Sequence, residues 1–485
     1  MGYLDIRRWG GWIAVATALA LGGCDTPRSD PELSAQALVG GTLIDGTGAA
    51  PVSDAVVVVR DGRIDCAGSR SDCAVPRGAR TIDVSGKWIT PGIIDSHVHF
   101  SQTAFADGRP DFLDLRELYP YEQVESRLRN HPETQFRSYL CSGVTAVFDV
   151  GGYPWTWGLP ELAENDTSAP HVASAGPLLS TLDHWLNLPA ERQFMYFESE
   201  EKSVEFVRYI HAHGAAAVKI WFIAVSDEEF EDKGAAVLAA GAEAKRLGIP
   251  LIVHATDLRE AKVAVQAGAH LLVHSVWDQP VDEEFIEMVR DTGTIYNPTL
   301  IVGGGYLAAA EAIAAGEVPA MDDPNGCIDP WTRDKIEAIP ELSADLISEE
   351  TLRRRRERVA KRNGIGDANL MTLLDAGIPI AMGTDAGNVL TFHGPSVYAE
   401  TEAMQAAGMT PEEVLVSATS TAARAMLRSD IGTLAAGQIA DLLVLGSDPL
   451  EDITNIRSLE MVMRGGSMRS VQELAAVASA PGDID

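Results

Sequence analysis

The sequence predicts an α/β fold, a parallel (β/α)8 TIM barrel joined to a small composite β-sandwich domain built from both termini. Eight apolar runs, with helical patterns between most of them, predict the barrel because parallel strands are buried on both faces. Strand-and-turn patterns at the two ends of the chain predict the β-domain. A doubly wound open sheet is the alternative, but no glycine-rich phosphate loop opens the first unit.

The barrel strands are expected where short apolar runs recur along the chain. These runs are residues 93–100, 144–149, 172–176, 217–222, 251–254, 271–274, 294–297 and 380–385. Helical patterns separate most of them, and the one at 227–247 ends at Gly248-Ile249-Pro250, where glycine and proline stop a helix. We therefore assign residues 88–425 to the barrel.

The β-domain is expected from two segments that lie far apart in the sequence. Val56 to Val59 form a buried-strand run, and Arg60-Asp61-Gly62-Arg63 is a hairpin turn before the return strand. Near the other end, a turn leads into an apolar strand at 437–445, and a second strand follows at 461–466. The resulting assignment is 38–87 and 426–470 for the β-domain, with a tail at 471–485.

The first residues resemble the signal peptide of a bacterial lipoprotein. Arg7-Arg8 precede an apolar core at 12–21 that is too short to span a bilayer comfortably. Leu21-Gly22-Gly23-Cys24 then resembles a lipobox, where the chain is cut before a cysteine that carries a lipid. A plain secretory signal with an incidental cysteine is the alternative. We expect a signal peptide at 1–23, a tether at 24–37, and an exported, periplasmic protein that Cys24 anchors to a bacterial membrane.

Composition and charge fit a globular protein that acts on small molecules. Of the 485 residues, 46% are hydrophobic, which is enough for a sizeable core. The net charge of −32 argues against a nucleic-acid partner, because phosphates would be repelled. A homo-oligomer is compatible with the sequence. Export would permit disulfides. Cys66 and Cys73 flank a turn-rich stretch, and the sequence leaves open whether they are bridged.

One connection between expected strands is unusually long. Residues 303–376 hold far more than one crossover helix and include a basic helical stretch around 353–362. Loops that follow barrel strands lie at the active face, so we expect part of this insertion to be a lid. The alternative is a surface elaboration with no role in turnover.

Histidines, a lysine and an aspartate stand in or at the ends of the expected strands. His97 and His99 are two residues apart in the first strand, so their side chains share one face. Lys219 lies in the fourth strand, and the other three end later strands: His254, His274 and Asp385. The C-terminal mouth of a barrel is where such residues converge, and neutral imidazoles suit a transition metal such as zinc.

This pattern resembles the amidohydrolase superfamily, in its imidazolonepropionase-like and Xaa-dipeptidase-like branch. The resemblance runs from residue 38 to about 466. It includes the motifs Thr90-Pro91-Gly92-Ile93-Ile94-Asp95, Gly383-Thr384-Asp385 and Gly437-Gln438-Ile439-Ala440-Asp441. It implies two divalent cations, taken as zinc. His97, His99 and Asp385 would hold one, and His254 and His274 the other. A carbamylated Lys219 would bridge them; an unmodified lysine and a mononuclear site are the alternative.

The resemblance also implies a reaction. A hydroxide that bridges the metals would attack a carbonyl, with Asp385 moving its proton to the leaving group. The expected enzyme is a hydrolase of amide or peptide bonds, either dipeptidase-like or an N-acyl-amino-acid amidase. A lactonase or esterase on the same binuclear site is the alternative. The alternative outside the enzymes is a lipoprotein that binds a ligand without catalysis.

Several further residues are candidates for substrate contact, with ordinary packing as the alternative for each. They are His184, Trp221, Trp277, Tyr296 and His393. The tryptophans near one rim would suit a bulky or aromatic substrate. No arginine near a strand end indicates a carboxylate clamp. His211 and His213 form a second His-X-His pair, but in a helix such residues diverge, so we expect them at the surface.

Overall fold

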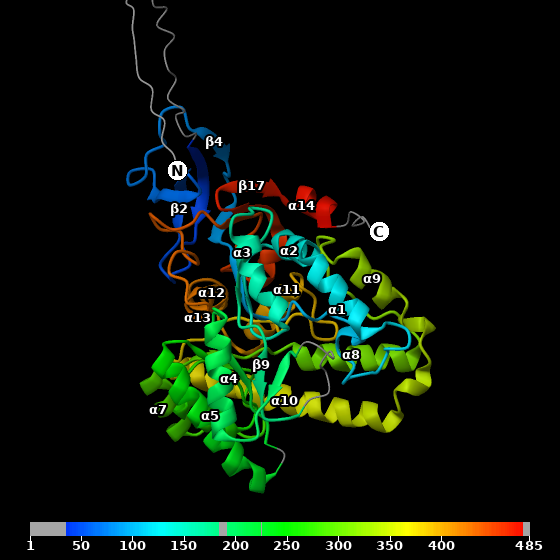
Figure 1. Cartoon of the computed structure of the whole chain (residues 1–485). Coiled ribbons are helices and arrows are strands. Elements are labelled where there is room, and N and C mark those ends of the chain that lie inside the picture. Colours follow the sequence, from blue (N-terminus) through cyan, green and yellow to red (C-terminus); the bar gives the residue numbers. More distant parts are fainter. Residues whose placement is uncertain (1–34, 184–191, 225, 479–485) are drawn as a thin grey trace, which may run out of the picture.

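A computed structural model describes residues 35–183, 192–224 and 226–478. The expected signal peptide, Cys24 and His184 lie outside the described residues. Strands from both ends of the chain form one sheet, and parallel strands and helices form the larger part of the molecule (Figure 1).

The terminal strands form a single eight-stranded sheet with the order β17-β16-β15-β5-β1-β2-β3, in which β4 also pairs with β1. We predicted a sandwich, but all eight strands are connected, because β1 pairs with β4 along its first half and with β5 along its second. The strands are β1 (Gln36–Leu43), β2 (Val52–Arg60), β3 (Arg63–Ser69), β4 (Arg80–Asp83), β5 (Trp88–Pro91), β15 (Leu442–Leu445), β16 (Leu459–Arg464) and β17 (Ser467–Ser470).

Local sequence explains this sheet. Asp61 and Gly62, at the expected turn between β2 and β3, both have positive φ, which is the conformation of a tight two-residue hairpin turn. Leu38 and Val57 from one end of the chain share a buried cluster with Leu442 and Val444 from the other. Neither end could bury this apolar face alone, so the two ends pair.

The remaining strands are parallel and fall into two sheets. Their orders are β6-β7-β8 and β10-β9-β11-β12-β13-β14. The strands are β6 (Ile93–Val98), β7 (Val144–Asp149), β8 (His171–Ser174), β9 (Leu178–Ser180), β10 (Phe194–Tyr196), β11 (Val218–Trp221), β12 (Leu251–His254), β13 (Ala269–Val273) and β14 (Ile295–Asn297). Seven match the expected barrel strands, whereas the short strands β9 and β10 were not expected.

The expected eighth strand, 380–385, is not a continuous strand. It pairs only through isolated bridges, Ile380 with Tyr296 and Ala386 with Val98. On the other side, the Ala216 amide donates to the Ser174 carbonyl at 2.9 Å and links β8 to the start of β11. The segment at 380–386 therefore lies between β14 and β6, beside the strand that carries the first histidine pair.

Helices follow most parallel strands and cap the sheets. They are α1 (Tyr121–Asn130), α2 (Pro132–Cys141), α3 (Leu159–Glu164), α4 (Glu200–Ala212), α5 (Asp227–Leu247), α6 (Leu258–Gln266), α7 (Glu283–Thr292), α8 (Val302–Ala315), α9 (Pro330–Glu337), α10 (Glu349–Asp375), α11 (Ser396–Ala407), α12 (Pro411–Val416), α13 (Ala422–Ala425) and α14 (Val471–Ala478). Ser226 caps the start of α5, and Gly248 ends it with positive φ, as expected from the sequence.

Two features of the helices bear on the expected domains. The expected tail, 471–485, contains α14, whose Val471 and Leu474 join the main core. Among the described residues, none of the helices combines the length and apolar character needed to cross a membrane.

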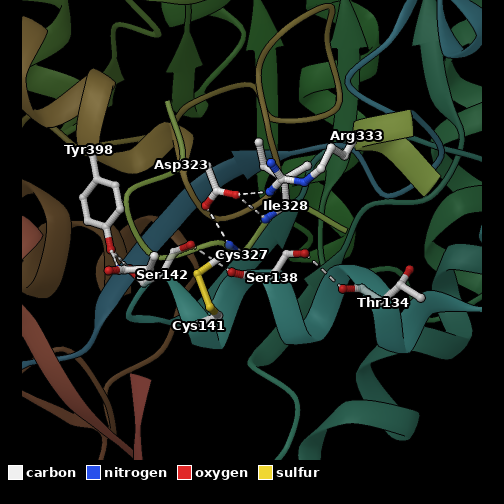
Figure 2. The surroundings of a disulfide bond; sticks show 10 residues. Thr134, Ser138, Cys141, Ser142, Asp323, Cys327, Ile328, Arg333 and Tyr398 are labelled. Carbon is white, nitrogen blue, oxygen red and sulfur yellow. Dashed lines mark hydrogen bonds and ion pairs between the residues drawn. A yellow bond between two sulfur atoms is a disulfide. The ribbon is translucent and has the colours of Figure 1, made fainter. Parts of the chain in front are cut away.

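The insertion is built of α8, α9, α10 and short 3-10 turns, and α8 and α10 lie side by side (Figure 1). A disulfide ties it to α2, since Cys141 at the end of α2 is bonded to Cys327 (Figure 2). Asp323 orders the same loop by accepting hydrogen bonds from the amides of Cys327 and Ile328 at 2.6 and 3.0 Å. The insertion is therefore fixed to the body of the protein.

The second disulfide joins Cys66 and Cys73, whose Cα atoms are 5.6 Å apart. This is the pair that the sequence left open, and it closes the turn-rich stretch after β3. The Cys141–Cys327 pair was not predicted, because 186 residues separate the two cysteines in the sequence.

Candidate metal centre

The end of β6 brings two histidines and a distant aspartate to one point. His97 Nε2 and His99 Nε2 lie 3.3 and 3.0 Å from the same oxygen, Oδ1 of Asp385. All three side chains are buried, and one ligand atom from each lies within 4.8 Å of the others. Three donors of these types at such separations can surround one transition-metal cation.

A buried carboxylate, Asp95, holds the two motifs of this cluster together. Its oxygens accept hydrogen bonds from the amide and hydroxyl of Thr384 at 3.0 and 2.6 Å, and from the His97 amide at 3.3 Å. The Asp385 amide in turn donates to the His97 carbonyl at 2.8 Å. Burial raises the pKa of Asp95 to about 7 despite these hydrogen bonds. Asp95 therefore ties β6 to the Gly383-Thr384-Asp385 segment.

Backbone conformation explains the residues in that segment. A Cβ atom on Gly383 would lie 2.8 Å from His97 Cβ and 2.4 Å from Asn297 Nδ2, so only glycine fits. Asp385 adopts a φ of 63°, in the left-handed region that non-glycine residues rarely occupy. His274 does the same, with a φ of 75°. Such backbone strain concentrates at functional sites.

Lys219, His254 and His274 come from β11, β12 and the residue after β13, and they line the same cavity as His97, His99 and Asp385. The His274 ring lies 4.4 Å from the His254 ring and 5.0 Å from the His97 ring, between centroids. Thr299 Oγ1 is hydrogen-bonded to His274 Nδ1 at 2.6 Å, which leaves Nε2 available as a ligand. His99 is oriented in the same way, because its Nδ1 donates to the Gly151 carbonyl at 2.6 Å.

The electrostatics of the cluster favour a cation. Burial holds the pKa values of His97, His254 and His274 well below the usual value, so these imidazoles are neutral at pH 7. Neither ring nitrogen of His97 has a hydrogen-bond partner among the described residues, although the ring is fully buried. A buried carboxylate among neutral imidazoles with free lone pairs fits a divalent metal.

The cluster opens into a cavity of about 610 Å³. Trp221 and Trp277 contribute to its wall, and residues of α8 and α10, both in the insertion, also line it. The insertion therefore borders the same space as the candidate metal ligands, which is what a lid position requires.

Sequence comparison identifies the protein family. A model of the amidohydrolase family matches residues 88–469. The chain belongs to the amidohydrolase family. It is thus an enzyme, a hydrolase of the amidohydrolase superfamily that acts on carbon–nitrogen bonds, and the family is metal-dependent.

Individual relatives are distant. The chain is 25% identical over 420 residues to imidazolonepropionase of Caulobacter vibrioides, which covers 81% of this chain and 88% of that protein. Among solved structures, a Xaa-Pro dipeptidase with bound methionine has a TM-score of 0.67 at 21% identity, covering 90% of this chain and all of the other. Molinate hydrolase has a TM-score of 0.64 at 23% identity, covering 93% and 98%. The similarity to the two solved structures supports the fold, and these relatives leave the substrate open.

The expected substrate contacts of this amidohydrolase divide into two groups. Trp221 and Trp277 line the cavity. Tyr296 and His393 do not, because both are buried behind it: the Tyr296 hydroxyl accepts from the Val276 amide at 2.8 Å, and His393 Nε2 donates to the His99 carbonyl at 3.0 Å. Tyr296 and His393 therefore support the backbone of the site. His184 lies outside the described residues.

Sequence reasoning missed a set of cavity residues that come from outside the strand ends. Arg109 and Tyr306 both meet Asn388, whose side chain donates to the Asp385 carbonyl at 3.0 Å. Five arginines line the cavity: Arg109, Arg354, Arg355, Arg358 and Arg362. The only signal in the sequence was the spacing of the last four within one helix, which gives them a common side.

Proposed function

We propose that this amidohydrolase cleaves amide or peptide bonds of small molecules, as a dipeptidase-like enzyme or an N-acyl-amino-acid amidase. Two divalent cations, proposed to be zinc, would be held by His97, His99, Lys219, His254, His274 and Asp385. The observation that carries the proposal is the buried carboxylate of Asp385, with His97 and His99 within 3.3 Å. Lys219, in the neighbouring sheet, is 3% exposed.

Lys219 would act as the bridge after carbamylation. An ammonium group cannot ligate a cation, whereas a carbamate carries the charge of a carboxylate. Its formation requires a neutral amine, which attacks carbon dioxide and loses a proton as the N–C bond forms. Burial lowers the pKa of Lys219 to about 7, so a large share of the amine is neutral near pH 7. Lys219 also has no hydrogen bond or ion pair to any described residue, which leaves it available for this reaction.

The residues of the site then suggest how hydrolysis proceeds. Bound divalent cations would polarise the scissile carbonyl and lower the pKa of water. Asp385 takes the proton of the attacking water as the new C–O bond forms. It then delivers that proton to the amine nitrogen as the C–N bond breaks. Thr299 and the Gly151 carbonyl hold the rings of His274 and His99 in place throughout.

A substrate panel tests this function. Metal-loaded protein is assayed with dipeptides, N-acyl amino acids and lactones, in the presence of zinc and bicarbonate. We expect hydrolysis of one of the C–N classes at a higher kcat/KM than any lactone. Faster cleavage of lactones would favour the lactonase alternative. A protein that holds two metals and cleaves no compound in the panel would instead be a binding lipoprotein.

Substitution of the bridge tests the binuclear arrangement separately. Lys219→Ala is expected to lose the second metal and most activity, and short carboxylic acids are expected to restore part of both. Full activity of Lys219→Ala without any added acid would contradict the carbamate and leave a mononuclear site.

We also propose that the parallel strands close into a (β/α)8 barrel. The support is the chain of backbone contacts from β8 to β11 and from β14 through residues 380–386 to β6. A crystal structure in which 380–386 lies apart from β6 would contradict closure.

Export and lipid attachment at Cys24 are proposed from the lipobox-like sequence, and the two disulfides are consistent with an oxidising compartment. Metabolic labelling with palmitate tests this, since Cys24→Ser is expected to abolish the label. Unchanged labelling of that variant would contradict the anchor.

A further inference from the structure

The arginines of α10 fall into two sets that have different surroundings. In the first set, each guanidinium forms an ion pair with a glutamate. The nitrogen–oxygen distance is 2.7 Å both for Arg356 with Glu311 and for Arg353 with Glu357. Arg354 is paired with Glu350 in the same way, although it also borders the cavity. The other set is the arginine row, defined as Arg355, Arg358 and Arg362, and all three line the cavity. None of the row forms an ion pair with a carboxylate among the described residues.

The row occupies one side of the helix. Its members are three and four residues apart, which places them on a common face over about 10 Å of helix length. Arg362 is at the metal end of the row. Its Nη2 donates to the Thr299 carbonyl at 2.9 Å, and the Thr299 hydroxyl is bonded to the metal-ligand candidate His274. The row therefore extends from the metal centre outward along the cavity wall.

Arg355 is held in place without being neutralised. Arg355 lies with its guanidinium carbon 4.7 Å from the centre of the Phe112 ring, and its buried Nε has no hydrogen-bond partner among the described residues. Burial lowers the pKa of Arg355 and of Arg362, but guanidinium groups stay protonated in proteins. Three cationic groups therefore face the cavity.

The rest of the wall does not compensate this charge. Arg109 is already paired with Asp111 at 2.6 Å. Of the described residues that line the cavity, Asp385 alone carries a carboxylate, and the proposed metals would use it. Arg355 and Arg362 are partly buried and have no carboxylate partner among the described residues, and the exposed Arg358 lies between them in the row. Partly desolvated charge of this kind is balanced when an anionic ligand enters. In a chain with a net charge of −32, this concentration of positive charge is local to one cavity.

We propose that the substrates of this site are amides with two carboxylates, such as peptides that end in glutamate or aspartate. This inference rests on the proposed function, because it assigns the substrate class of the same site. One guanidinium can bind one carboxylate through two hydrogen bonds, and a row of arginines about 10 Å long can bind two carboxylates. Arg362 and Arg358 would bind the carboxylate nearer the scissile bond, and Arg355 the more distant one.

Kinetics with matched dipeptides test the proposal. Full-length, metal-loaded enzyme is assayed with Ala-Glu, Ala-Gln and Ala-Lys. We expect kcat/KM for Ala-Glu to exceed that for Ala-Gln by about tenfold or more, mainly through KM, with Ala-Lys slowest. Arg355→Gln is expected to remove the preference for Ala-Glu over Ala-Gln. Arg356→Gln, on the same helix but paired with Glu311 and away from the cavity wall, is expected to leave the preference unchanged.

A binding measurement does not depend on turnover. Glutarate is titrated calorimetrically into the metal-loaded wild type, into the variant with all three row arginines changed to glutamine, and into Arg356→Gln. We expect binding at least about tenfold weaker in the triple variant alone, with metal content unchanged in all three. Equal binding in the wild type and triple variant overturns the arginine row as an anion site. If no dipeptide is cleaved while glutarate binding follows the row, the proposed function fails and the anion site stands.

Discussion

The chain contains two His-X-His sequences, and the structure places them in opposite settings. His97 and His99 lie in and just after a buried strand, with both rings beside Asp385. His211 and His213 lie at the end of α4, where both are exposed. The His213 ring stacks on Trp157 with centroids 4.8 Å apart. Residues two apart share a face in a strand and diverge in a helix, so the same spacing brings both rings to one buried carboxylate in the strand only.

The largest effect is expected when alanine replaces a histidine of the strand pair. His97→Ala removes one of the three proposed ligands that lie together at Asp385. We expect loss of bound metal and a fall in kcat/KM of more than about 100-fold, because even supporting residues of metal ligands are worth 10–100-fold. Metal content by mass spectrometry and steady-state kinetics check this. A variant with full metal content and activity would remove the distinction between the pairs.

The second-largest effect is expected at Thr299, which orients the ring of the proposed ligand His274. Thr299→Val keeps the shape of the side chain but removes the hydroxyl that bonds His274 Nδ1 at 2.6 Å. We expect metal affinity to fall by about 10–100-fold with the fold intact. Competition with a fluorescent zinc chelator measures the affinity, and circular dichroism provides the fold control. Unchanged affinity would mean that His274 needs no support from Thr299.

A smaller effect is expected where the backbone must approach His97. Gly383→Ala would bring a Cβ atom within 2.8 Å of His97 Cβ. Such overpacking typically costs about 1–3 kcal/mol of unfolding free energy. Thermal unfolding of the metal-free protein checks it, with Gly304→Ala as the control, since nothing lies within 4 Å of a Cβ there. Equal melting temperatures for the two variants would contradict the tight contact.

The smallest effect is expected at the exposed pair. A double variant, His211→Ala with His213→Ala, should keep its metal content and activity, and its unfolding free energy should change by about 0.5 kcal/mol or less. The same metal analysis and melting curves serve here. Loss of metal from this variant would show that the helical pair contributes ligands after all.

These cases show why much of the site could be predicted from the sequence. Strand ends carry their own signal, because a parallel strand is a short apolar run and the polar residue that ends it must face the common mouth. That reasoning located His97, His99, His254 and His274. It also located Asp385, although the segment at 380–386 pairs only through isolated bridges.

The arginine row and the Cys141–Cys327 disulfide could not be predicted in the same way. Both depend on where the insertion lies relative to the body of the protein, and local patterns do not encode that placement. The pairs of Arg353 and Arg354 with glutamates of α10 follow from local spacing. The pair of Arg356 with Glu311 and the arginines that face the cavity depend on tertiary packing. Tyr296 and His393 show the opposite error. Both lie near strand ends and were expected to contact substrate, but they lie behind the cavity wall and hydrogen-bond to its backbone.

The central claim is that His97, His99 and Asp385, together with Lys219, His254 and His274, bind the cations on which hydrolysis depends. The most direct measurement is the number of divalent cations per chain in the purified protein, with kcat/KM before and after chelation. The account predicts two cations per chain, loss of activity on chelation and recovery with zinc. A metal-free chain that hydrolyses carbon–nitrogen bonds at an undiminished rate would contradict it.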